Sequence, residues 1–415
     1  MGEGVIYSWN PVLNLVREIK LEFIKKFGGL FTIDFGTWLE LLDNDKYNDI
    51  FEPLQFNQSG NFLLIRYGLS DVQKGLWEDP NSIYRECRSV VIDLDKEQLV
   101  IAPFRKFFNL DEVEENKLSK IQEKFLTAKH LYVVDKLDGS MQSARYYDGE
   151  VRLFGSIALT DKDSWRLEAG RNLLTKQYTD MIKSLPNITF IFEYVSPSNL
   201  HVVPYKKRDE GMYLIGARDV DTGEHYDPGT INLLAIIHGI KTPKIEDRTL
   251  DELLTLMKEA PSTEREGWVI NLDGHMLKIK CDDYVNIHKA LDNASSVNVI
   301  IQSVAEDTFD DLISKVPFEN RERLYTIHDM VVRYINKTKE DIKYWYDRAP
   351  KSDRKTFMIY VDKTVPKNIR KYVRKEYLGE DYNLLHKRHN SYKRMRDLGY
   401  SERDIAKELG GVDLE

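Results

Sequence analysis

The alternation of apolar and polar residues divides the chain into a strand-rich part and a helical part. Between residues 61 and 280, short β-branched or aromatic runs are separated by turn pairs such as Asp148-Gly149 and Asp273-Gly274. This pattern is typical of antiparallel hairpins. Leucines at helical spacing predict two helical insertions within this part, near residues 164–184 and 249–259.

Beyond about Ala290 the pattern changes to a helical one. Glycine becomes scarce until Gly379, and apolar residues recur at steps of three and four, as in Leu324, Ile327, Met330, Val331 and Tyr334. The stretch from Ser401 to Leu409 has the start signal and apolar stripe of one more helix. We therefore predict an α+β fold, with an antiparallel-sheet domain and an N-terminal extension over residues 1–290 and an all-α domain over residues 291–415.

Length and composition agree with two domains. The chain has 415 residues, of which 42% are hydrophobic, so each domain can bury its own core. The apolar runs are far shorter than the roughly 20 residues that cross a bilayer, and the first residues do not form a secretory signal. We expect no membrane association and a cytoplasmic location. Cys87 and Cys281 are too few for a disulfide framework or a four-cysteine zinc site.

Charge is distributed unevenly. The net charge is -8, but residues 351–400 contain 14 Lys/Arg and 6 Asp/Glu. Aromatic residues that can stack on unpaired bases lie among these cations: Tyr360, Tyr372, Tyr377, Tyr382 and Tyr392. Two interpretations remain open, a contact surface for a phosphate backbone or a solvated helical surface whose tyrosines pack inward.

Lys136 is the candidate nucleophile. The segment Lys136-Leu137-Asp138-Gly139-Ser140 follows the apolar run 131–134, and a second strand is predicted to begin near Met141. A lysine at the end of a strand and before a glycine turn is held on rigid backbone, and it attacks phosphorus if its amine is neutral. Because the pKa of a free lysine is about 10.4, we expect neighbouring positive charge or burial to lower the pKa of Lys136.

Lys278 and Lys280 supply neighbouring positive charge. The run 276–280 alternates as in a strand, so the two lysines share one face and Leu277 and Ile279 share the other. Two ammonium groups on one face suit a bound triphosphate, because they neutralise its oxygens and the charge of a leaving pyrophosphate. If that face is open to solvent, they are ordinary surface lysines.

Two glutamates adjoin apolar strands. Glu193 follows the run 188–192, and Glu266 precedes the run 267–270. A carboxylate beside a buried strand is costly unless it has a partner, and Mg²⁺, a ribose hydroxyl or a lysine would serve. A structural salt bridge is the alternative for either glutamate.

These pieces occur in the order of the motifs of the covalent nucleotidyltransferase superfamily. Lys136-Leu137-Asp138-Gly139 resembles the nucleotidyl-lysine motif, Glu193-Tyr194 the third, Glu266-Gly267 the fourth and Lys278-Ile279-Lys280 the fifth. The superfamily includes DNA ligases, RNA ligases and mRNA capping enzymes.

A closer resemblance, over roughly residues 62–290, is to the phage-type RNA ligase 1 family. It is carried by Glu86-Cys87-Arg88 and by the segments 106–110, 193–199 and 278–288.

The resemblance implies an antiparallel-sheet nucleotidyltransferase domain and an ATP-dependent RNA ligase. Lys136 would take AMP from ATP, AMP would move to an RNA 5′-phosphate, and a 3′-hydroxyl would displace it. By similarity, the residues that contact phosphates would be Arg88, Lys106, Lys278 and Lys280. Those that hold hydrated Mg²⁺ (or Mn²⁺) or orient the nucleotide would be Asp138, Glu193 and Glu266, and those that line the pocket would be Phe108 and Tyr284.

The resemblance also implies a biological setting. RNA with a 5′-phosphate and a 3′-hydroxyl end would be the substrate, in tRNA or single-stranded RNA repair in the cytoplasm of a bacterium infected by a bacteriophage. A polynucleotide kinase-phosphatase would prepare the ends. In one departure, Phe154 occupies a position where the family has a lysine, and Arg152 is a candidate substitute.

Three alternatives remain. An mRNA capping guanylyltransferase or a DNA ligase shares the nucleotidyl-lysine chemistry, but these proteins usually append a β-barrel, whereas the C-terminal pattern here is helical. A non-catalytic RNA-binding protein could keep the fold, although neither the lysine nor the carboxylates have been lost.

Overall fold

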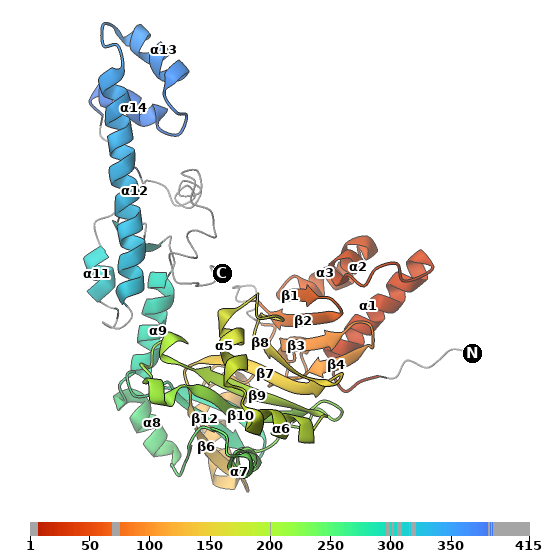
Figure 1. Ribbon diagram of the computed structural model, residues 1–415. Coiled ribbons are helices and arrows are strands. Elements are labelled where there is room, and N and C mark those ends of the chain that lie inside the picture. Colours follow the sequence, from red (N-terminus) through yellow and green to blue (C-terminus); the bar gives the residue numbers. More distant parts are fainter. Residues whose placement is uncertain are drawn as a thin grey trace. The chain divides into compact units, whose positions relative to one another are not determined.

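The chain divides into two compact units. The structure, a computed structural model, describes residues 7–384 except 69–74, 200, 296–298, 301–302, 305–308, 315, 317–320, 381 and 383. One unit extends to Val285 and the other begins at Asn286. The first combines helices with three sheets that are antiparallel apart from one short pair, and the second is helical where it is described, which confirms the predicted α+β class (Figure 1). Among the described helices, none is long and apolar enough to cross a membrane.

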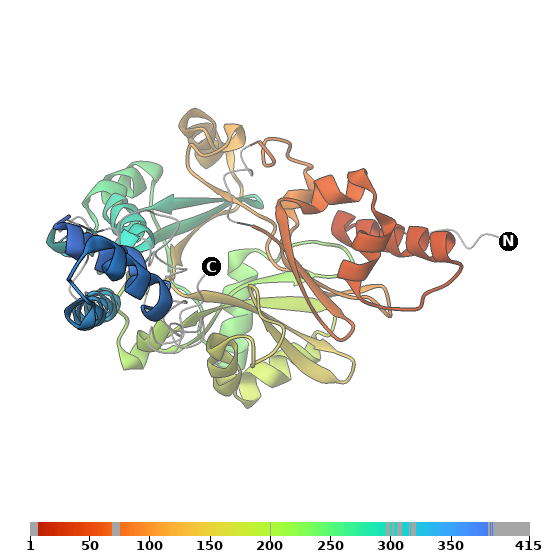
Figure 2. The ribbon, with the colours of Figure 1, turned by 90° about the horizontal axis from the view of Figure 1, so that it is seen from above.

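The N-terminal helices cover a four-stranded sheet, here called sheet A. Its order is β1-β2-β3-β4, with β1 (Leu54–Ser59), β2 (Phe62–Tyr67), β3 (Arg88–Asp93) and β4 (Gln98–Ile101). The helices are α1 (Pro11–Phe27), α2 (Phe35–Leu42) and α3 (Asp45–Phe51), which lie together at one end of the first unit (Figure 2). Phe23, Phe35 and Trp38 are fully buried in the core that joins them to the sheet.

The second sheet, sheet C, has the order β10-β9-β7-β8. Its strands are β7 (Ser140–Tyr147), β8 (Glu150–Gly155), β9 (Ile188–Val195) and β10 (Gly211–Asp219). The predicted turn between β7 and β8 is present, with positive φ at Asp148 and Gly149. The helices α5 (Trp165–Leu173), α6 (Lys176–Ser184) and α7 (Pro228–His238) share a buried core with this sheet. The insertion predicted as one helix is thus two, α5 and α6, which are separated at Leu174 and Thr175.

The third sheet, sheet B, has the order β11-β6-β12-β13-β5. Its strands are β5 (Phe108–Asn109), β6 (Leu131–Lys136), β11 (Ile245–Glu246), β12 (Gly267–Leu272) and β13 (His275–Lys280). The helices α4 (Leu118–Thr127) and α8 (Leu250–Glu259) belong to the same unit. The helix predicted near residues 249–259 is α8, and Thr249 caps its N-terminus. Asp273 and Gly274 form the predicted turn between β12 and β13.

The second unit contains α11 (Phe309–Ser314), α12 (Arg321–Arg348), α13 (Arg354–Thr364) and α14 (Arg370–Leu378), and α9 (Asp282–Ser295) crosses the boundary. The predicted apolar stripe lies on α12, where Leu324, Met330 and Val331 are buried. The side chain of Ile327 and the helix predicted from Ser401 lie outside the described residues.

Gly267 is the backbone position on which sheet B depends. It pairs with Lys136 of β6 on one side and with Lys280 of β13 on the other. Its φ is +147°, and a Cβ atom there would lie 2.1 Å from the carbonyl oxygen of Ile279. Only glycine fits, because both the backbone angle and the space exclude a side chain.

Replacing this glycine should destabilise the protein far more than replacing a turn glycine. We expect Gly267→Ala to lower the free energy of unfolding by at least about 3 kcal/mol, because it combines strain with a clash. The matched control is Gly149→Ala, where φ is +80° and nothing lies within 4 Å of the added Cβ. That change should cost about 1–2 kcal/mol. Urea unfolding of both variants measures these losses of unfolding free energy. Equal losses would contradict the conclusion that only glycine fits at position 267.

Candidate active site

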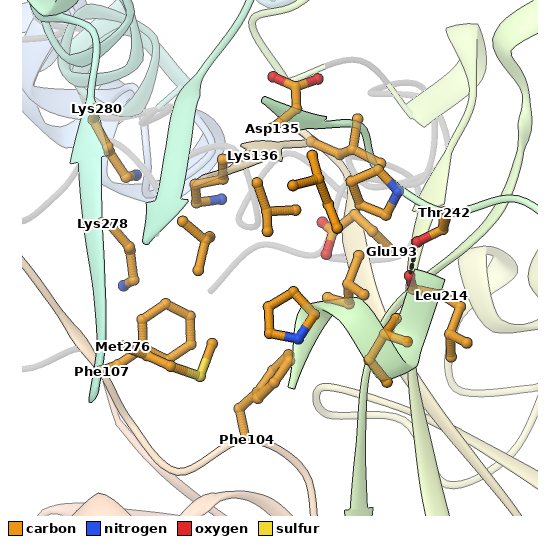
Figure 3. A pocket seen from close by; sticks show the side chains of 18 of the residues that line it. Phe104, Phe107, Asp135, Lys136, Glu193, Leu214, Thr242, Met276, Lys278 and Lys280 are labelled. Atoms are coloured by element: carbon orange, nitrogen blue, oxygen red, sulfur yellow. Dashed lines mark hydrogen bonds between the residues drawn. The ribbon is translucent and has the colours of Figure 1, made fainter. Parts of the chain in front are cut away.

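A cavity of about 910 Å³, including space open to solvent, lies between sheets B and C of the first unit (Figure 3). One part of its wall is charged and consists of Arg88, Asp135, Lys136, Glu193, Lys278 and Lys280. The rest is mainly apolar and consists of Phe104, Phe107, Val134, Leu137, Leu214, Ile215, Pro228, Ile231, Thr242, Pro243, Ile245, Val269 and Met276. The cavity therefore suits a ligand with a flat apolar part and an anionic part.

The alternation of sheet B produces the charged wall. Lys136 on β6 and Lys278 and Lys280 on β13 face the cavity, as the period of a strand predicts. Leu277 and Ile279 point to the other face, where they are buried. The prediction that the two lysines of β13 share one face is confirmed, and that face is a cavity wall.

Glu266 connects two of these lysines. Its Oε2 accepts a hydrogen bond from Lys136 Nζ at 2.7 Å, and its Oε1 lies 2.9 Å from Lys280 Nζ. The Glu266 side chain is only 4% exposed. Removing one partner of a buried ion pair costs roughly 3–5 kcal/mol, because the other charge is left uncompensated. The two ammonium groups and the carboxylate therefore hold one another in place.

The electrostatics of Lys136 differ from the expectation. Burial lowers its pKa, but the negative charges of Glu266, Glu193 and Asp138 outweigh burial, so the pKa is raised. The expectation of a lowered pKa is wrong, because the carboxylates around the amine affect its pKa more strongly than burial does. Lys136 is held here as an ammonium ion.

Lys278 is the lysine whose pKa is lowered well below its ordinary value. Burial is the main cause, and the positive charges of Arg88 and Lys136 add to it. Lys278 Nζ lies 4.9 Å from the centre of the Phe107 ring, and the guanidinium carbon of Arg88 lies 4.9 Å from the same ring. Neither cation pairs with a carboxylate among the described residues. Aromatic faces stabilise cations without neutralising them.

Lys106 is stabilised in the same way. Its Nζ lies 4.4 Å from the ring of Tyr67, 4.6 Å from Trp77 and 5.2 Å from Phe108. It does not line the cavity, but its charge contributes to the lowered pKa of Lys278.

A bulge directs Arg88 into the cavity. Between β2 and β3, Arg66 pairs with Arg88 while Val90 pairs with the residue before Arg66, so Ser89 is an extra residue. Ser89 has a φ of +66°, and its hydroxyl donates to the carbonyl of Ser156 at 2.6 Å. A bulge re-aims neighbouring side chains in this way.

Glu86, two residues before Arg88, has a structural role. Arg218 of β10 donates to both of its carboxylate oxygens, at 2.8 and 3.2 Å, and this pair is almost fully buried. The pair ties the segment that carries Arg88 to sheet C.

Asp138 is occupied by protein donors. Its Oδ2 accepts hydrogen bonds from the amides of Val202 and Val203, at 2.8 and 2.9 Å, and its Oδ1 accepts one from the Tyr284 hydroxyl at 2.8 Å. The Asp138 amide donates to the Tyr205 hydroxyl at 2.9 Å. This network fixes the turn that follows Lys136.

Two predicted pocket residues do not line the cavity. Phe108 and Tyr284 are each 2% exposed and are buried behind the wall. The neighbour of Phe108 in the chain, Phe107, lines the cavity instead. The sequence contained both rings, but the strand β5 is too short for its alternation to distinguish them.

Phe154 stands where the RNA ligase resemblance places a lysine. It does not line the cavity, so this difference removes no cation from the cavity wall. Phe154 is buried between sheets A and C, with its ring 5.8 Å from that of Phe62. Arg152 does not line the cavity either, because it pairs with Glu150 at 3.3 Å and lies over Phe62. The suggested substitution of Arg152 for a lysine is therefore wrong.

Glu193 lies inside β9 rather than at its end, and it faces the cavity. Burial raises its pKa to about 7, although Lys136 opposes this effect. Within the described residues, no three His, Cys, Asp or Glu side chains converge on a direct metal site.

The raised pKa of Glu193 predicts how stability depends on pH. A carboxyl group whose folded pKa is raised favours folding when protonated, so its contribution is lost as pH rises from about 4.5 to about 7. We expect Glu193→Gln to have the higher free energy of unfolding at pH 8, by about 1–3 kcal/mol, with the gap closing at pH 5. Urea unfolding at both values tests this. A gap that is independent of pH would refute it.

Comparisons with known proteins agree with this site. Residues 86–284 match a family model described as RNA ligase. A protein of Thermovibrio ammonificans named "Putative RNA ligase" is 28% identical over 64% of this chain and 70% of its own length. A "Putative bifunctional polynucleotide kinase/RNA ligase" of Autographa californica nuclear polyhedrosis virus is 25% identical over 56% of this chain, which spans only 35% of that protein.

Two solved structures are similar to parts of this chain. An RNA ligase of Naegleria gruberi with PPi has a TM-score of 0.36 and 20% identity, over 44% of this chain and 57% of that one. An archaeal ATP-dependent RNA ligase has a TM-score of 0.43 and 12% identity, over 74% and 82%. Residues 86–284, just under half of the chain, are similar to the RNA ligase family whose model they match.

Proposed function

We propose that this chain is an ATP-dependent RNA ligase that joins RNA 5′-phosphate and 3′-hydroxyl ends through lysyl-AMP on Lys136. The observation that carries the proposal is the cavity itself. Lys136 lies there between the apolar part of the wall, here called the apolar slot, and two cations, Arg88 and Lys278, that pair with no carboxylate in the described part of the chain. The family match and the relatives named as RNA ligases support the same activity.

The first step transfers AMP to the protein. Adenine occupies the apolar slot, and the triphosphate extends towards Arg88 and Lys278. Lys136 Nζ bonds to the α-phosphorus, the α–β anhydride breaks, and pyrophosphate leaves with its charge opposed by the cations. In the second step the P–N bond breaks as an RNA 5′-phosphate oxygen takes the AMP. In the third, a 3′-hydroxyl attacks that 5′-phosphate and AMP leaves.

Lys136 must lose a proton before it attacks. Glu266 holds that proton in place, so positive charge brought near Glu266 would make deprotonation easier. Bound Mg²⁺, or Mn²⁺, would supply such charge and neutralise phosphate oxygens, and Glu193 and Glu266 would hold it through water. Asp138, whose oxygens are already engaged, would position the turn of Lys136.

The substrate and setting are part of the proposal. We propose repair of tRNA or other single-stranded RNA in a bacterial cytoplasm during bacteriophage infection, with the segment 291–415 as an RNA-binding or specificity domain. The viral relative named as a combined kinase and ligase supports cooperation with a polynucleotide kinase-phosphatase. Labelling from GTP would instead favour a capping guanylyltransferase, and sealing only of nicked DNA would favour a DNA ligase.

Lys136 should be the residue that carries AMP. Incubation with α-labelled ATP and Mg²⁺ should give a covalent protein-AMP adduct that is stable to denaturation, and Lys136→Ala should abolish it. Lys176→Ala, an exposed lysine of α6 paired with Asp180, is the matched control and should label normally. An adduct that persists in Lys136→Ala would refute the mechanism, and RNA binding without any adduct would favour a non-catalytic protein.

Phe107 should keep Arg88 and Lys278 available for phosphates. Phe107→Leu keeps an apolar side chain but removes the aromatic face, so we expect about 5–30-fold weaker binding of inorganic pyrophosphate, from the loss of about 1–2 kcal/mol. Phe107→Tyr retains the face and should bind nearly normally. Calorimetric titration of the three proteins measures this. Equal affinities in all three would show that the ring acts only by packing.

A further inference from the structure

The end of α12 and the elements that follow it carry an excess of positive charge. Residues 337–375 contain 13 Lys/Arg and 5 Asp/Glu, in a chain whose net charge is -8. Most of these cations are exposed, including Lys343, Lys351, Arg354 and Lys355. None of these four forms an ion pair with a described carboxylate, whereas Arg374 pairs with Asp362. Exposed cations that form no ion pair with a described carboxylate can bind an external polyanion.

Two tyrosines at the end of α12 lie under cations. The guanidinium carbon of Arg348 lies 3.5 Å from the centre of the Tyr344 ring, and Lys351 Nζ lies 3.9 Å from that of Tyr346. Tyr344 is 48% exposed, so its ring is partly covered by Arg348 and partly open. An exposed ring that carries a planar cation is a platform on which an unpaired base can stack.

Two of the tyrosines singled out by the sequence, Tyr372 and Tyr377, do not offer such a platform. Tyr372 is 5% exposed, and the Tyr377 ring stacks on Phe357 at 4.1 Å inside the core of the second unit. Tyr392 lies outside the described residues. The inward-packing interpretation therefore holds for Tyr372 and Tyr377, and the exposed stacking residue, Tyr344, precedes the basic segment.

We infer that the surface formed by the end of α12 and the start of α13, named here the α12–α13 surface, binds single-stranded RNA (Figure 1). Tyr344 and Arg348 stack a base, and the phosphates are contacted by Lys343, Lys351, Arg354 and Lys355. Phosphate contacts alone would accept duplex and single strand alike, but a base can stack on Tyr344 only when it is unpaired. This inference rests on the proposed function and assigns RNA binding within the segment 291–415 to named residues.

The test uses the full chain and a 12-nucleotide RNA with 5′-hydroxyl ends, which cannot be joined, in a fluorescence anisotropy titration. Tyr344→Ala should weaken single-strand binding about tenfold, and Tyr344→Phe should restore it. Lys343→Gln combined with Lys351→Gln and Lys355→Gln should reduce the slope of log affinity against log salt by about 2. A control with the same charge change in the first unit, at Lys117 before α4, Lys176 of α6 and Lys258 of α8, should bind like the parent.

Adenylylation by ATP without RNA separates this inference from the proposed function. If all variants label normally, unchanged RNA affinity in Tyr344→Ala and in the triple variant overturns the α12–α13 surface and leaves the ligase proposal intact. The same titration with a duplex of that RNA tests the stacking role. If Tyr344→Ala weakens the binding of duplex and single-stranded RNA equally, the stacking role is overturned. If the parent protein does not label at all, the proposed function fails, whatever the RNA titrations give.

Discussion

The register of three strands around Gly267 is the constraint on which the cavity depends. Because this residue has no side chain, the backbone of β12 can lie between Lys136 and Lys280, and Glu266 can reach both ammonium groups. A one-residue slip of β13 would turn both of its lysines to the opposite face of sheet B. The strand register of sheet B therefore determines both its backbone pairing and the face on which its charged side chains lie.

The protein stabilises its buried cations in two different ways. Lys136 and Lys280 are held by a carboxylate, which keeps Lys136 protonated. Arg88, Lys106 and Lys278 lie instead against aromatic rings, which attract positive charge without cancelling it. Arg88 and Lys278 line the cavity, so an entering anion would meet two cations that pair with no described carboxylate. Lys136, the proposed nucleophile, would stay protonated until further positive charge arrives beside Glu266.

The second unit handles charge differently. Its cations are mostly exposed, on helices whose apolar residues form separate cores, so each is worth little for stability. Retaining so many unpaired cations in a chain of negative net charge has a natural explanation in the binding of a polyanion. The cations that line the cavity are held at defined positions, whereas those of the second unit are mostly exposed.

The sequence by itself determined the elements and the order of the motifs. Turn pairs with Asp-Gly, the alternation of residues 276–280 and the helix near residues 249–259 are local properties, and each was predicted at its place. Which of two adjacent rings faces the cavity, Phe107 or Phe108, was decided only by tertiary packing. Tertiary packing also decided that β10, α7 and the segment before β11 form the apolar wall of the cavity, because nothing in the local sequence distinguishes an apolar residue of a cavity wall from one of the core.

The protonation state of Lys136 is the clearest example of a property that tertiary structure decided. The motif identified the lysine, and its cationic neighbours suggested a lowered pKa. The distance to Glu266 reversed that sign, and it is set by strands more than a hundred residues apart in the chain. Local sequence specifies which chemical groups are present and how strands and helices begin and end. Their electrostatic effect on one another falls with distance and grows with burial, and both quantities exist only in the folded protein.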